Sequence, residues 1–494
     1  MTDRLWEMSA TELAAAYRSR EVSPVEAVEA VLARIEAVEP VINAFVTTVP
    51  DQALAAARAA ERRLLSEPAE DLPALLGVPV SVKDLTDTAG VRTTYGSVHY
   101  KDHVPDTDAL GWARLKAAGA VLVGKTCTPE FGMLGVTESR LTGVTNNPWN
   151  PAMTAGGSSG GAAAAVAAGC APLAWGSDGG GSIRIPASCC GVVGLKASMG
   201  RIPVYGEADV YGSVDTAGPL TRTVADCVLM LQATAGPDLR DPLSLPASPT
   251  PFTDALRDLS LRGLRIAYSP DLGHGHVASH VLRLVEEAGT VLTDVLGASV
   301  RPVEVDLPDP VQYFQDFWAP AFAVGLRDLV EAHGWDPDSS HPMISEIGAL
   351  VSTRSAVDYW RTSVQTRGRI AEGFASVFAQ YDLLITPTMP TTVFPHPGPA
   401  GGPAQNEGHP VAVPGIDFHR LTEPPSHAGL PAISVPCGFD SDGLPVGLQI
   451  IGPHHADAAV LQAAAAFEQA TAWHTRRPPL PAPSATASAS DGAL

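Results

Sequence analysis

The sequence has few cysteines, few basic side chains and no apolar run long enough to cross a bilayer. Its six cysteines are scattered over 494 residues and form no C-x-x-C pair. This usage favours reduced thiols in a cytoplasmic protein over a disulfide framework. Lysine and arginine together number 32 against 53 acidic residues, which gives a net charge of −21. Such a balance argues against a nucleic-acid-binding surface, which requires clustered lysine and arginine.

The longest run of small apolar residues, AAAAVAAGCAPLAW at 162–175, is too short to span a membrane, and we interpret it as a buried helix. The opening residues, MTDRLWEMSATEL, lack the basic and apolar regions of a signal peptide. The chain shows no internal repeat, and 45% of its residues are hydrophobic, enough for a large buried core. We therefore expect a cytoplasmic protein without membrane association.

Two serines near the start predict helix N-termini. Ser9 precedes ATEL and Ser23 precedes PVEA, so that in each case a glutamate three residues after the serine completes a capping box. Further along, short apolar segments predict five strands, at 74–85, where the strand ends at Lys83, and at 119–125, 382–388, 431–438 and 444–452. Strands mixed with long helical stretches indicate an α/β fold.

Three segments lack any periodicity. Two of them, 236–251 and 387–410, are rich in proline and are predicted to be loops over the core. The third, 478–494, is of low complexity and is predicted to be a disordered tail.

Three short motifs match known site patterns but lack the context that such sites need. GAVLVGKT at 119–126 fits a phosphate-binding loop, but a strand fills the interval between its glycines and Pro129 obstructs a following helix. GSSGG at 157–161 fits the nucleophile elbow of α/β-hydrolases, but a loop precedes it in place of a strand. His274 and His276 have no carboxylate or thiol cluster to complete a metal shell. We expect neither a metal nor a cofactor.

The segment GSDGGGSIRIP at 176–186 places three glycines directly before Ser182. Glycine tolerates positive φ, so we expect the N–H groups of the three to turn toward one point and form an anion-binding nest. A serine beside such a nest has a nucleophile and an oxyanion hole in one loop. A flexible surface loop would also explain the glycines, but it would not explain the apolar residues that follow them.

A nucleophilic serine needs a base, and no histidine stands in a suggestive context. Lys83 ends an apolar strand, and burial favours the neutral amine, which can accept a proton. A solvated lysine paired with Asp84 is the alternative. From the residues alone both interpretations stay open.

Taken together, these segments resemble the amidase signature family. The resemblance runs from about residue 10 to 475 and is carried by EVSPVEAVEAVLARIEAVEPVINAFV, GVPVSVKDL, GKTCTPEFGM, NPWNP, GGSSGG, GSDGGGSIRIPAS, DLLITPT and GLPAISVPCGFDSDGLPVGLQIIG. It implies a single large α/β domain over 1–477, with a twisted mixed sheet of about eleven strands between helical layers. Within that domain we expect an N-terminal helical part over about 1–70 and a variable substrate-side region over about 240–380, where the resemblance is weak.

The resemblance also implies a Ser–cis-Ser–Lys triad. On this sequence the base is Lys83, the bridging serine after a cis peptide bond is Ser158, and the acylated nucleophile is Ser182. The oxyanion would be bound by the backbone N–H groups of Ser182 and of the three glycines before it, Gly179, Gly180 and Gly181.

Further residues match supporting positions of the family. Asp178 and Arg184 would brace the glycine loop, and Ser159 would hydrogen-bond within the same network. Gly132 and Met133 would form the opposite wall of the acyl site.

The reaction that the resemblance implies is hydrolysis of an amide, releasing ammonia or an amine. The stretch YFQDFWAPAF at 313–322 is aromatic, and we predict that Trp318 lines an apolar substrate pocket, although a helix core would give the same pattern. This favours a stand-alone amidase for aliphatic or aryl amides, with nylon-type oligoamides and carbamates among the candidates.

Two alternatives remain. The glutamine-hydrolysing component of glutamyl-tRNA amidotransferase belongs to the same family and uses an arginine of the weakly matching region to bind glutamine; here that region offers Arg354, Arg361 and Arg367, none in a context that we recognise. A non-catalytic binding subunit of a larger assembly is the other alternative, and the intact triad argues against it. The expected partner is a small-molecule amide rather than a nucleic acid or a membrane, and a homodimer stays open.

Overall fold

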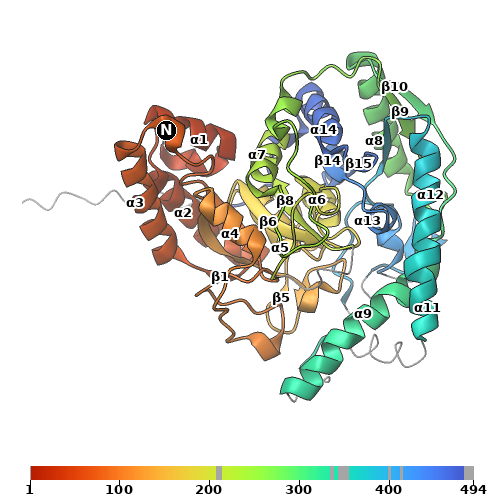
Figure 1. The fold of residues 1–494 in the computed structure, drawn as a ribbon, viewed down its shortest axis with the longest axis horizontal. Helices are drawn as coiled ribbons and strands as arrows, with labels where there is room; N and C mark the ends of the chain where they lie inside the picture. Colours follow the sequence, from red (N-terminus) through yellow and green to blue (C-terminus); the bar gives the residue numbers. More distant parts are fainter. Residues whose placement is uncertain are drawn as a thin grey trace, which may run out of the picture.

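A mixed sheet of eleven strands runs through the centre of the molecule (Figure 1). The computed structural model describes residues 2–206, 214–333, 336, 339–342, 355–398, 402–411 and 415–482. Helices pack on both faces of the sheet. The predicted α/β class and the strand number implied by the resemblance are confirmed.

The strands of the sheet lie in an order far from that of the chain. In space they are β1 (Phe45–Thr48), β3 (Val121–Thr126), β2 (Pro79–Lys83), β6 (Leu173–Asp178), β8 (Thr216–Thr221), β7 (Val193–Lys196), β14 (Ala432–Phe439), β15 (Pro445–Ile451), β11 (Leu383–Pro387), β9 (Arg265–Tyr268) and β10 (Ser299–Pro302). The neighbours β3–β2, β2–β6, β11–β9 and β9–β10 are parallel, and the other pairs are antiparallel. The five strands predicted from the sequence correspond to β2, β3, β11, β14 and β15.

Two short ladders stand apart from the sheet, β4 (Glu138–Ser139) with β5 (Gly143–Val144) and β12 (Gln405–Asn406) with β13 (His409–Pro410). The α-helices among the described residues are α1 (Ala10–Ser19), α2 (Pro24–Ile42), α3 (Pro50–Ser66), α4 (Leu110–Ala117), α5 (Gly160–Ala168), α6 (Arg184–Cys190), α7 (Val224–Thr234), α8 (Ser279–Thr290), α9 (Pro310–His333), α11 (Ala356–Arg361), α12 (Arg367–Phe378), α13 (Glu423–His427) and α14 (Asp457–Thr471). Helices α1 to α3 lie at one end of the molecule and α12 at the other (Figure 1). Ser9 and Ser23 form the predicted capping boxes of α1 and α2.

The two faces of the sheet belong to different apolar clusters. In β6, Leu173 and Trp175 lie in one cluster and Ala174 in the other, because successive side chains of a strand point to opposite faces. The first cluster includes buried residues of α7, α8 and α14, and the second includes buried residues of α2, α5 and α6.

Helix α5 is buried along its whole length, because glycine and alanine let its backbone approach the sheet. A Cβ on Gly161 would lie only 2.5 Å from the backbone nitrogen of Cys127. The apolar run at 162–175 was expected to be one helix, and this is wrong for its second half. Gly169 ends the helix in the left-handed conformation and β6 begins at Leu173.

The structure agrees with the two predicted loops but differs from the prediction for the start of the tail. Segment 236–251 contains no helix or strand, and in the described part of 387–410 the strands beyond the end of β11 are the two-residue β12 and β13. Residues 478–482, predicted to belong to a disordered tail, pack on the fold. Leu480 contacts the second apolar cluster, and Arg34 donates a hydrogen bond to the carbonyl of Pro481. The rest of the predicted tail, 483–494, lies outside the described residues.

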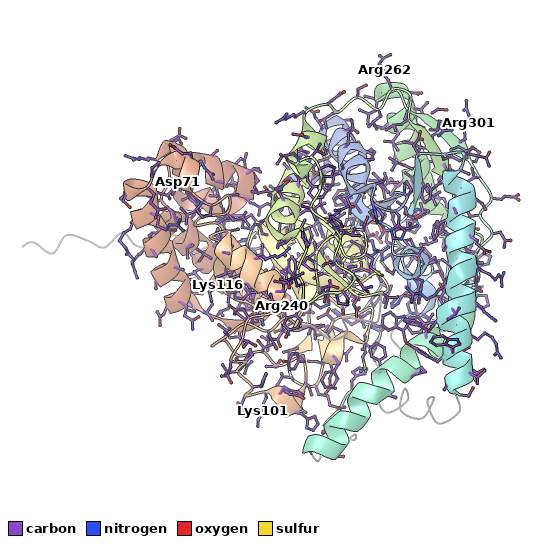
Figure 2. The ribbon with its side chains drawn as sticks, viewed as in Figure 1. Asp71, Lys101, Lys116, Arg240, Arg262 and Arg301 are labelled. Carbon is purple, nitrogen blue, oxygen red and sulfur yellow. The ribbon has the colours of Figure 1, made fainter. Side chains whose placement is uncertain are left out.

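Exposed basic side chains come from separate parts of the chain. Lys101, Lys116, Arg240, Arg262 and Arg301 are all exposed and lie on different segments (Figure 2). Among the described helices, none combines the length and the apolar composition that a membrane span needs.

Candidate active site

Lys83 is the last residue of β2 and is fully buried. Its Nζ atom lies 2.7 Å from Ser158 Oγ and 2.9 Å from Ser177 Oγ. The neighbouring Asp84 accepts hydrogen bonds from the backbone N–H and the hydroxyl of Thr94. Of the two interpretations that the sequence left open, the structure favours the buried lysine over the solvated one.

The turn that opens α5 carries two serines with different partners. The peptide bond between Gly157 and Ser158 is cis, as the resemblance implies. The N–H of Ser159 donates to the carbonyl of Ser182 at 3.1 Å, and its hydroxyl donates to the carbonyl of Ser177 at 3.2 Å. These bonds tie the turn to the segment that runs from the end of β6 to Ser182.

Ser182 lies in the loop between β6 and α6 and is half-buried. Its carbonyl is held by Ser159, whose neighbour Ser158 contacts Lys83. The structure therefore links the segments that carry the three predicted catalytic residues, which are β2, the turn before α5 and the loop after β6.

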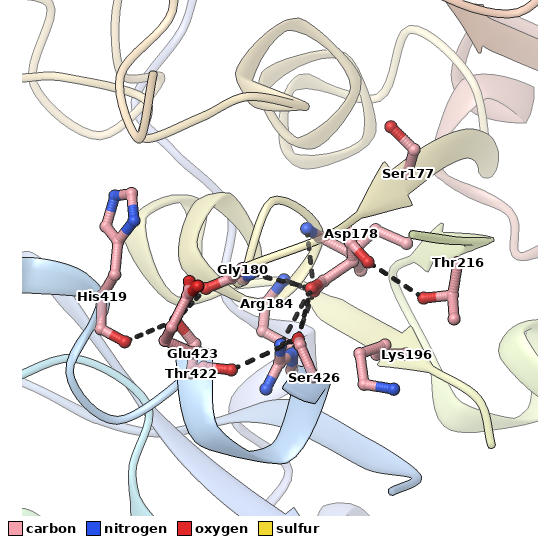
Figure 3. A network of polar contacts seen from close by, with 12 residues as sticks. Ser177, Asp178, Gly180, Arg184, Lys196, Thr216, His419, Thr422, Glu423 and Ser426 are labelled. Atoms are coloured by element: carbon pink, nitrogen blue, oxygen red, sulfur yellow. Dashed lines mark hydrogen bonds and ion pairs between the residues drawn. The ribbon is translucent and has the colours of Figure 1, made fainter. Parts of the chain in front are cut away.

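Asp178, the last residue of β6, braces the glycine loop (Figure 3). Its buried carboxylate accepts hydrogen bonds from the N–H of Gly181 at 2.7 Å and of Ile183 at 3.2 Å. The guanidinium of Arg184 binds the same carboxylate through two nitrogens, at 2.8 and 2.9 Å. Burial alone would raise the pKa of Asp178, but Arg184 holds that pKa below its usual value. The bracing roles expected for Asp178 and Arg184 agree with these contacts.

Arg184 is itself fully buried and satisfied by partners far along the chain. Its guanidinium donates to Gln449 Oε1 and to Ser426 Oγ, both at 2.8 Å. Residues of β15 and α13, as well as of β6, therefore fix the loop, and its conformation depends on segments that are distant in the sequence.

The conformation of the glycine loop differs from the expectation. Positive φ is found at Gly181, where φ is +131°, but not at Gly179 or Gly180. The N–H of Gly181 is bound to Asp178, so its expected role as an oxyanion donor is not supported by this geometry. A Cβ on Gly181 would also lie 2.1 Å from Thr422 Oγ1.

The first two glycines are explained by close approach of other segments. A Cβ on Gly179 would lie 2.4 Å from Asp215 Oδ1 and 2.7 Å from the ring of Trp318. A Cβ on Gly180 would lie 2.1 Å from Glu423 Oε2. No larger residue fits either position without moving these side chains.

The expected opposite wall of the acyl site also lies close to the serines. Gly132 has φ +73°, and a Cβ added to it would lie 3.4 Å from Ser158 Oγ. Met133 follows it and is half-buried. The preceding Glu130 is buried and accepts from the hydroxyl of Ser97 at 2.6 Å and from the N–H of His341 at 3.0 Å. This anchors part of the variable region beside the wall.

The aromatic stretch at 313–322 lies on α9. Tyr313, Phe317 and Trp318 are buried and Phe314 is half-buried, so much of the stretch is helix core. Trp318 is 9% exposed, and its indole N–H donates to Glu423 Oε1 at 2.6 Å. Its closeness to Gly179 puts Trp318 beside the glycine loop, as expected for a pocket residue. Most of its surface, however, is covered by other side chains of the protein.

The three arginines of the variable region have different surroundings. Arg354 lies outside the described residues. Arg361 is exposed and pairs with Asp358 at 3.0 Å. Arg367 is half-buried and donates to the carbonyl of His427 at 3.2 Å.

Sequence reasoning missed several residues of this network. Ser177 was part of the quoted glycine-rich segment but received no role, although it contacts Lys83. The others lie in the C-terminal half: Thr422, Glu423 and Ser426, which no motif of the resemblance covers, and Gln449, which lies in GLPAISVPCGFDSDGLPVGLQIIG but received no role.

The motifs set aside in the sequence have structural explanations. Lys125 of the phosphate-loop pattern is buried in β3 and donates to Thr93 Oγ1 at 2.7 Å. GSSGG follows a loop, and α5 begins within it. His276 lies 3.5 Å from Glu407. The part of the chain that the structure describes holds no group of three or more histidine, cysteine or acidic side chains suited to a metal ion.

Comparison with known proteins shows close similarity over nearly the whole chain. The sequence model of the family described as Amidase matches residues 26–461. An acylamidase of Rhodococcus erythropolis is 40% identical, over 95% of this chain and 97% of its own length. The A-type component of the glutamyl-tRNA(Gln) amidotransferase of Moorella thermoacetica is also 40% identical, over 96% of this chain and 99% of its own. The crystal structure of a bacterial aryl acylamidase of the amidase signature family has a TM-score of 0.88 and 32% identity, covering 94% of this chain and 97% of that one.

Proposed function

This chain belongs to the amidase family and hydrolyses amide bonds, and we propose that it does so through a covalent acyl-enzyme on Ser182. In this proposal Lys83 is the base and Ser158 is the bridge between base and nucleophile. One observation carries it: the buried Nζ of Lys83 lies 2.7 Å from Ser158 Oγ. The hydrogen bond from Ser159 to Ser182 supports it by holding the two serine loops together.

The proton transfers follow from these contacts. Ser182 Oγ attacks the amide carbon and gives its proton to Ser158 Oγ, which passes its own proton to the neutral amine of Lys83. The proton then returns along the same path to the leaving nitrogen, and the C–N bond breaks. Water, deprotonated by the same relay, attacks the Ser182 ester. The relay returns that proton to Ser182 Oγ as the ester bond breaks, and the acid is released.

The developing oxyanion needs preorganised donors. Because Asp178 occupies the N–H of Gly181, we assign this role to the N–H groups of Gly179, Gly180 and Ser182. Gly132 and Met133 would line the opposite side of the acyl group. Removal of one such donor in an acyl-transfer enzyme typically costs about 100- to 1,000-fold in kcat.

We propose small apolar amides as substrates, with an aliphatic or aryl acyl or leaving group. The aromatic surroundings of Trp318 support this choice, and the acylamidase and aryl acylamidase relatives agree with it. Trp318 itself is proposed to contribute to the pocket wall. Nylon-type oligoamides and carbamates stay within this class.

A second candidate is the glutamine-hydrolysing component of a tRNA-dependent amidotransferase, favoured by the equal identity to the relative from Moorella thermoacetica. Hydrolysis measured with the isolated chain distinguishes the two. We expect turnover of acyl anilides and aliphatic amides and poor turnover of glutamine. Good turnover of glutamine, either alone or only with a partner and tRNA, would favour the amidotransferase.

The nucleophile is tested by covalent labelling. A fluorophosphonate, which phosphonylates an activated serine hydroxyl with loss of fluoride, should label Ser182 in the wild type. Ser182→Ala should lose both label and turnover, while Ser159→Ala should keep the label on Ser182. Labelling at Ser159 would contradict the proposed triad.

We also propose a cytoplasmic location and leave a homodimer as a prediction. All six cysteines are unpaired and buried, which agrees with a reducing compartment. Analytical ultracentrifugation of the purified chain tests the assembly.

A further inference from the structure

A buried hydrogen-bonded group that the proposed reaction does not use lies behind the glycine loop. It consists of Trp318 from α9 with Glu423 and His427 from α13, and we call these three residues the loop bracket. Glu423 is fully buried. Its Oε1 accepts two hydrogen bonds, from the indole N–H of Trp318 at 2.6 Å and from His427 Nε2 at 2.8 Å.

The bracket is fixed on its outer side. Glu423 and His427 stand four residues apart on α13, so their side chains share one face of the helix. The imidazole of His427 is packed edge-on by Tyr313 and Phe317, at centroid distances of 5.1 and 4.7 Å. Arg367 donates to the carbonyl of His427. These contacts hold the donor that fixes Glu423 Oε1.

On its inner side the bracket lies directly against the glycine loop. Glu423 Oε2 is buried and has no hydrogen-bond partner among the described residues, yet a Cβ on Gly180 would lie 2.1 Å from it. A buried polar atom without a partner is unfavourable. Oε2 is therefore held there by the bonds on Oε1, against the backbone of the loop.

Further contacts involve Gly179 and the carbonyl of Gly180 itself. The Trp318 ring would meet a Cβ on Gly179 at 2.7 Å. Thr422, directly before Glu423, donates its hydroxyl to the carbonyl of Gly180 at 2.7 Å. That hydrogen bond fixes the orientation of the peptide plane that follows Gly180 (Figure 3). The side chains of Trp318 and Glu423 limit how the peptide before Gly180 can turn.

We infer that the loop bracket holds Gly179 and Gly180 with their N–H groups directed at the reacting carbonyl, and that Glu423 is a positioning residue for amide hydrolysis. The inference rests on the oxyanion role proposed above for this loop. Donors stabilise an oxyanion only if they are oriented before charge develops, and small displacements near a reacting centre are costly. Glu423 contributes to that orientation from a fully buried position, without touching the substrate.

The experiment compares four variants with the wild type on one acyl anilide. Glu423→Ala removes both contacts and should lower kcat about 10- to 100-fold, with KM within about threefold. Glu423→Gln keeps the volume and an oxygen acceptor for Trp318 and His427, and should recover part of the lost kcat. Glu372→Ala, which removes an exposed carboxylate on α12, is the matched control and should behave as the wild type.

A double-mutant cycle tests whether the bracket acts as a unit. Trp318→Phe, the fourth variant, removes the indole donor but keeps an aromatic ring, and should lower kcat by itself. In the Glu423→Ala background it should cause little further loss, because both changes break the same hydrogen bond. Additive losses would contradict a shared bracket, as would a rise in KM with unchanged kcat, which would make Glu423 a substrate-binding residue.

Labelling separates this inference from the proposed function. If the fluorophosphonate does not label Ser182 in the wild type, the proposed nucleophile fails. If it labels Ser182 at the same rate in the wild type and in Glu423→Ala, the triad stands and the bracket has no positioning role. Thermal unfolding is followed for every variant. Should Glu423→Ala not fold, Glu423→Gln and Trp318→Phe replace it: a lower kcat in both supports the inference, and a wild-type kcat in both contradicts it.

Discussion

Replacing Lys83 by methionine is the sharpest test of the proposed relay. Methionine has nearly the length of lysine and suits a fully buried position at the end of β2. It removes the amine that lies 2.7 Å from Ser158 Oγ and 2.9 Å from Ser177 Oγ. The change therefore deletes the base and leaves the surrounding shape nearly intact.

Two magnitudes follow. Loss of a general base typically lowers kcat about 100- to 10,000-fold, which corresponds to about 3–5 kcal/mol at the transition state. Loss of the amine as hydrogen-bond partner of the two serine hydroxyls lowers the free energy of unfolding by at most about 1–3 kcal/mol for each hydroxyl. Part of that cost is offset, because burying an amine is itself unfavourable. We expect activity to fall by orders of magnitude while the protein stays folded.

The assay is kcat/KM for an acyl anilide at a series of pH values from about 6 to 10, with the unfolding temperature of each protein measured in parallel. The wild type should show an ascending limb with pH, since the amine of Lys83 must be neutral to accept a proton. Lys116→Met, at an exposed lysine that pairs with Asp108, is the control. Activity of Lys83→Met within about tenfold of the wild type, or a wild-type profile that falls steadily from acid pH, would refute the relay.

Three further predictions concern specificity, bracing and stability. Trp318→Ala should raise KM for bulky apolar amides more than for acetamide. A fall in kcat for both substrates with unchanged KM would contradict a place in the pocket wall and would leave Trp318 with its role in the loop bracket alone. The unfolding temperature is measured as well, because truncating a buried aromatic side chain costs about 3–5 kcal/mol of stability. Asp178→Asn should reduce both turnover and unfolding temperature, since it breaks a buried ion pair with Arg184, and unchanged kinetics would argue against bracing. Burial raises the pKa of Glu468 to about 8, against the hydrogen bond from the Val224 N–H; the unfolded chain therefore loses this proton first as pH rises, and stability falls between about pH 4.5 and 8. Glu468→Gln should flatten that fall in calorimetry at about pH 5 and 8, and equal slopes would contradict the assignment.

Local signals in the sequence were sufficient for much of the fold. The capping boxes at Ser9 and Ser23 depend on residues only three positions apart. The strands β2 and β3 are parallel and buried, so their apolar runs stand out. Where a signal was ambiguous the prediction failed, as at 162–175, where small apolar residues continue from a helix into a strand.

The residues of the candidate site also fall into those that the sequence analysis predicted and those that it missed. Lys83, Ser158 and Ser182 lie in short motifs, and motif resemblance was enough to single them out. Ser177 lies in the same motif as Ser182 but received no role, and Glu423 lies in no such motif, because the importance of both comes from contacts with residues distant in sequence.

The sequence by itself predicted the α/β class, five of the eleven sheet strands and the side chains proposed to carry the chemistry, since these depend on short stretches of neighbouring residues. It left open whether Lys83 is buried, and only the packing of β2 between β3 and β6 decided that. It predicted three glycines in one nest, but the structure gives positive φ to Gly181, while Gly179 and Gly180 are excluded from carrying a Cβ by Trp318 and Glu423. Those side chains reach the loop through helices from the far part of the chain. Steric exclusion between distant segments leaves no periodic trace in a sequence, so only the tertiary structure could assign it.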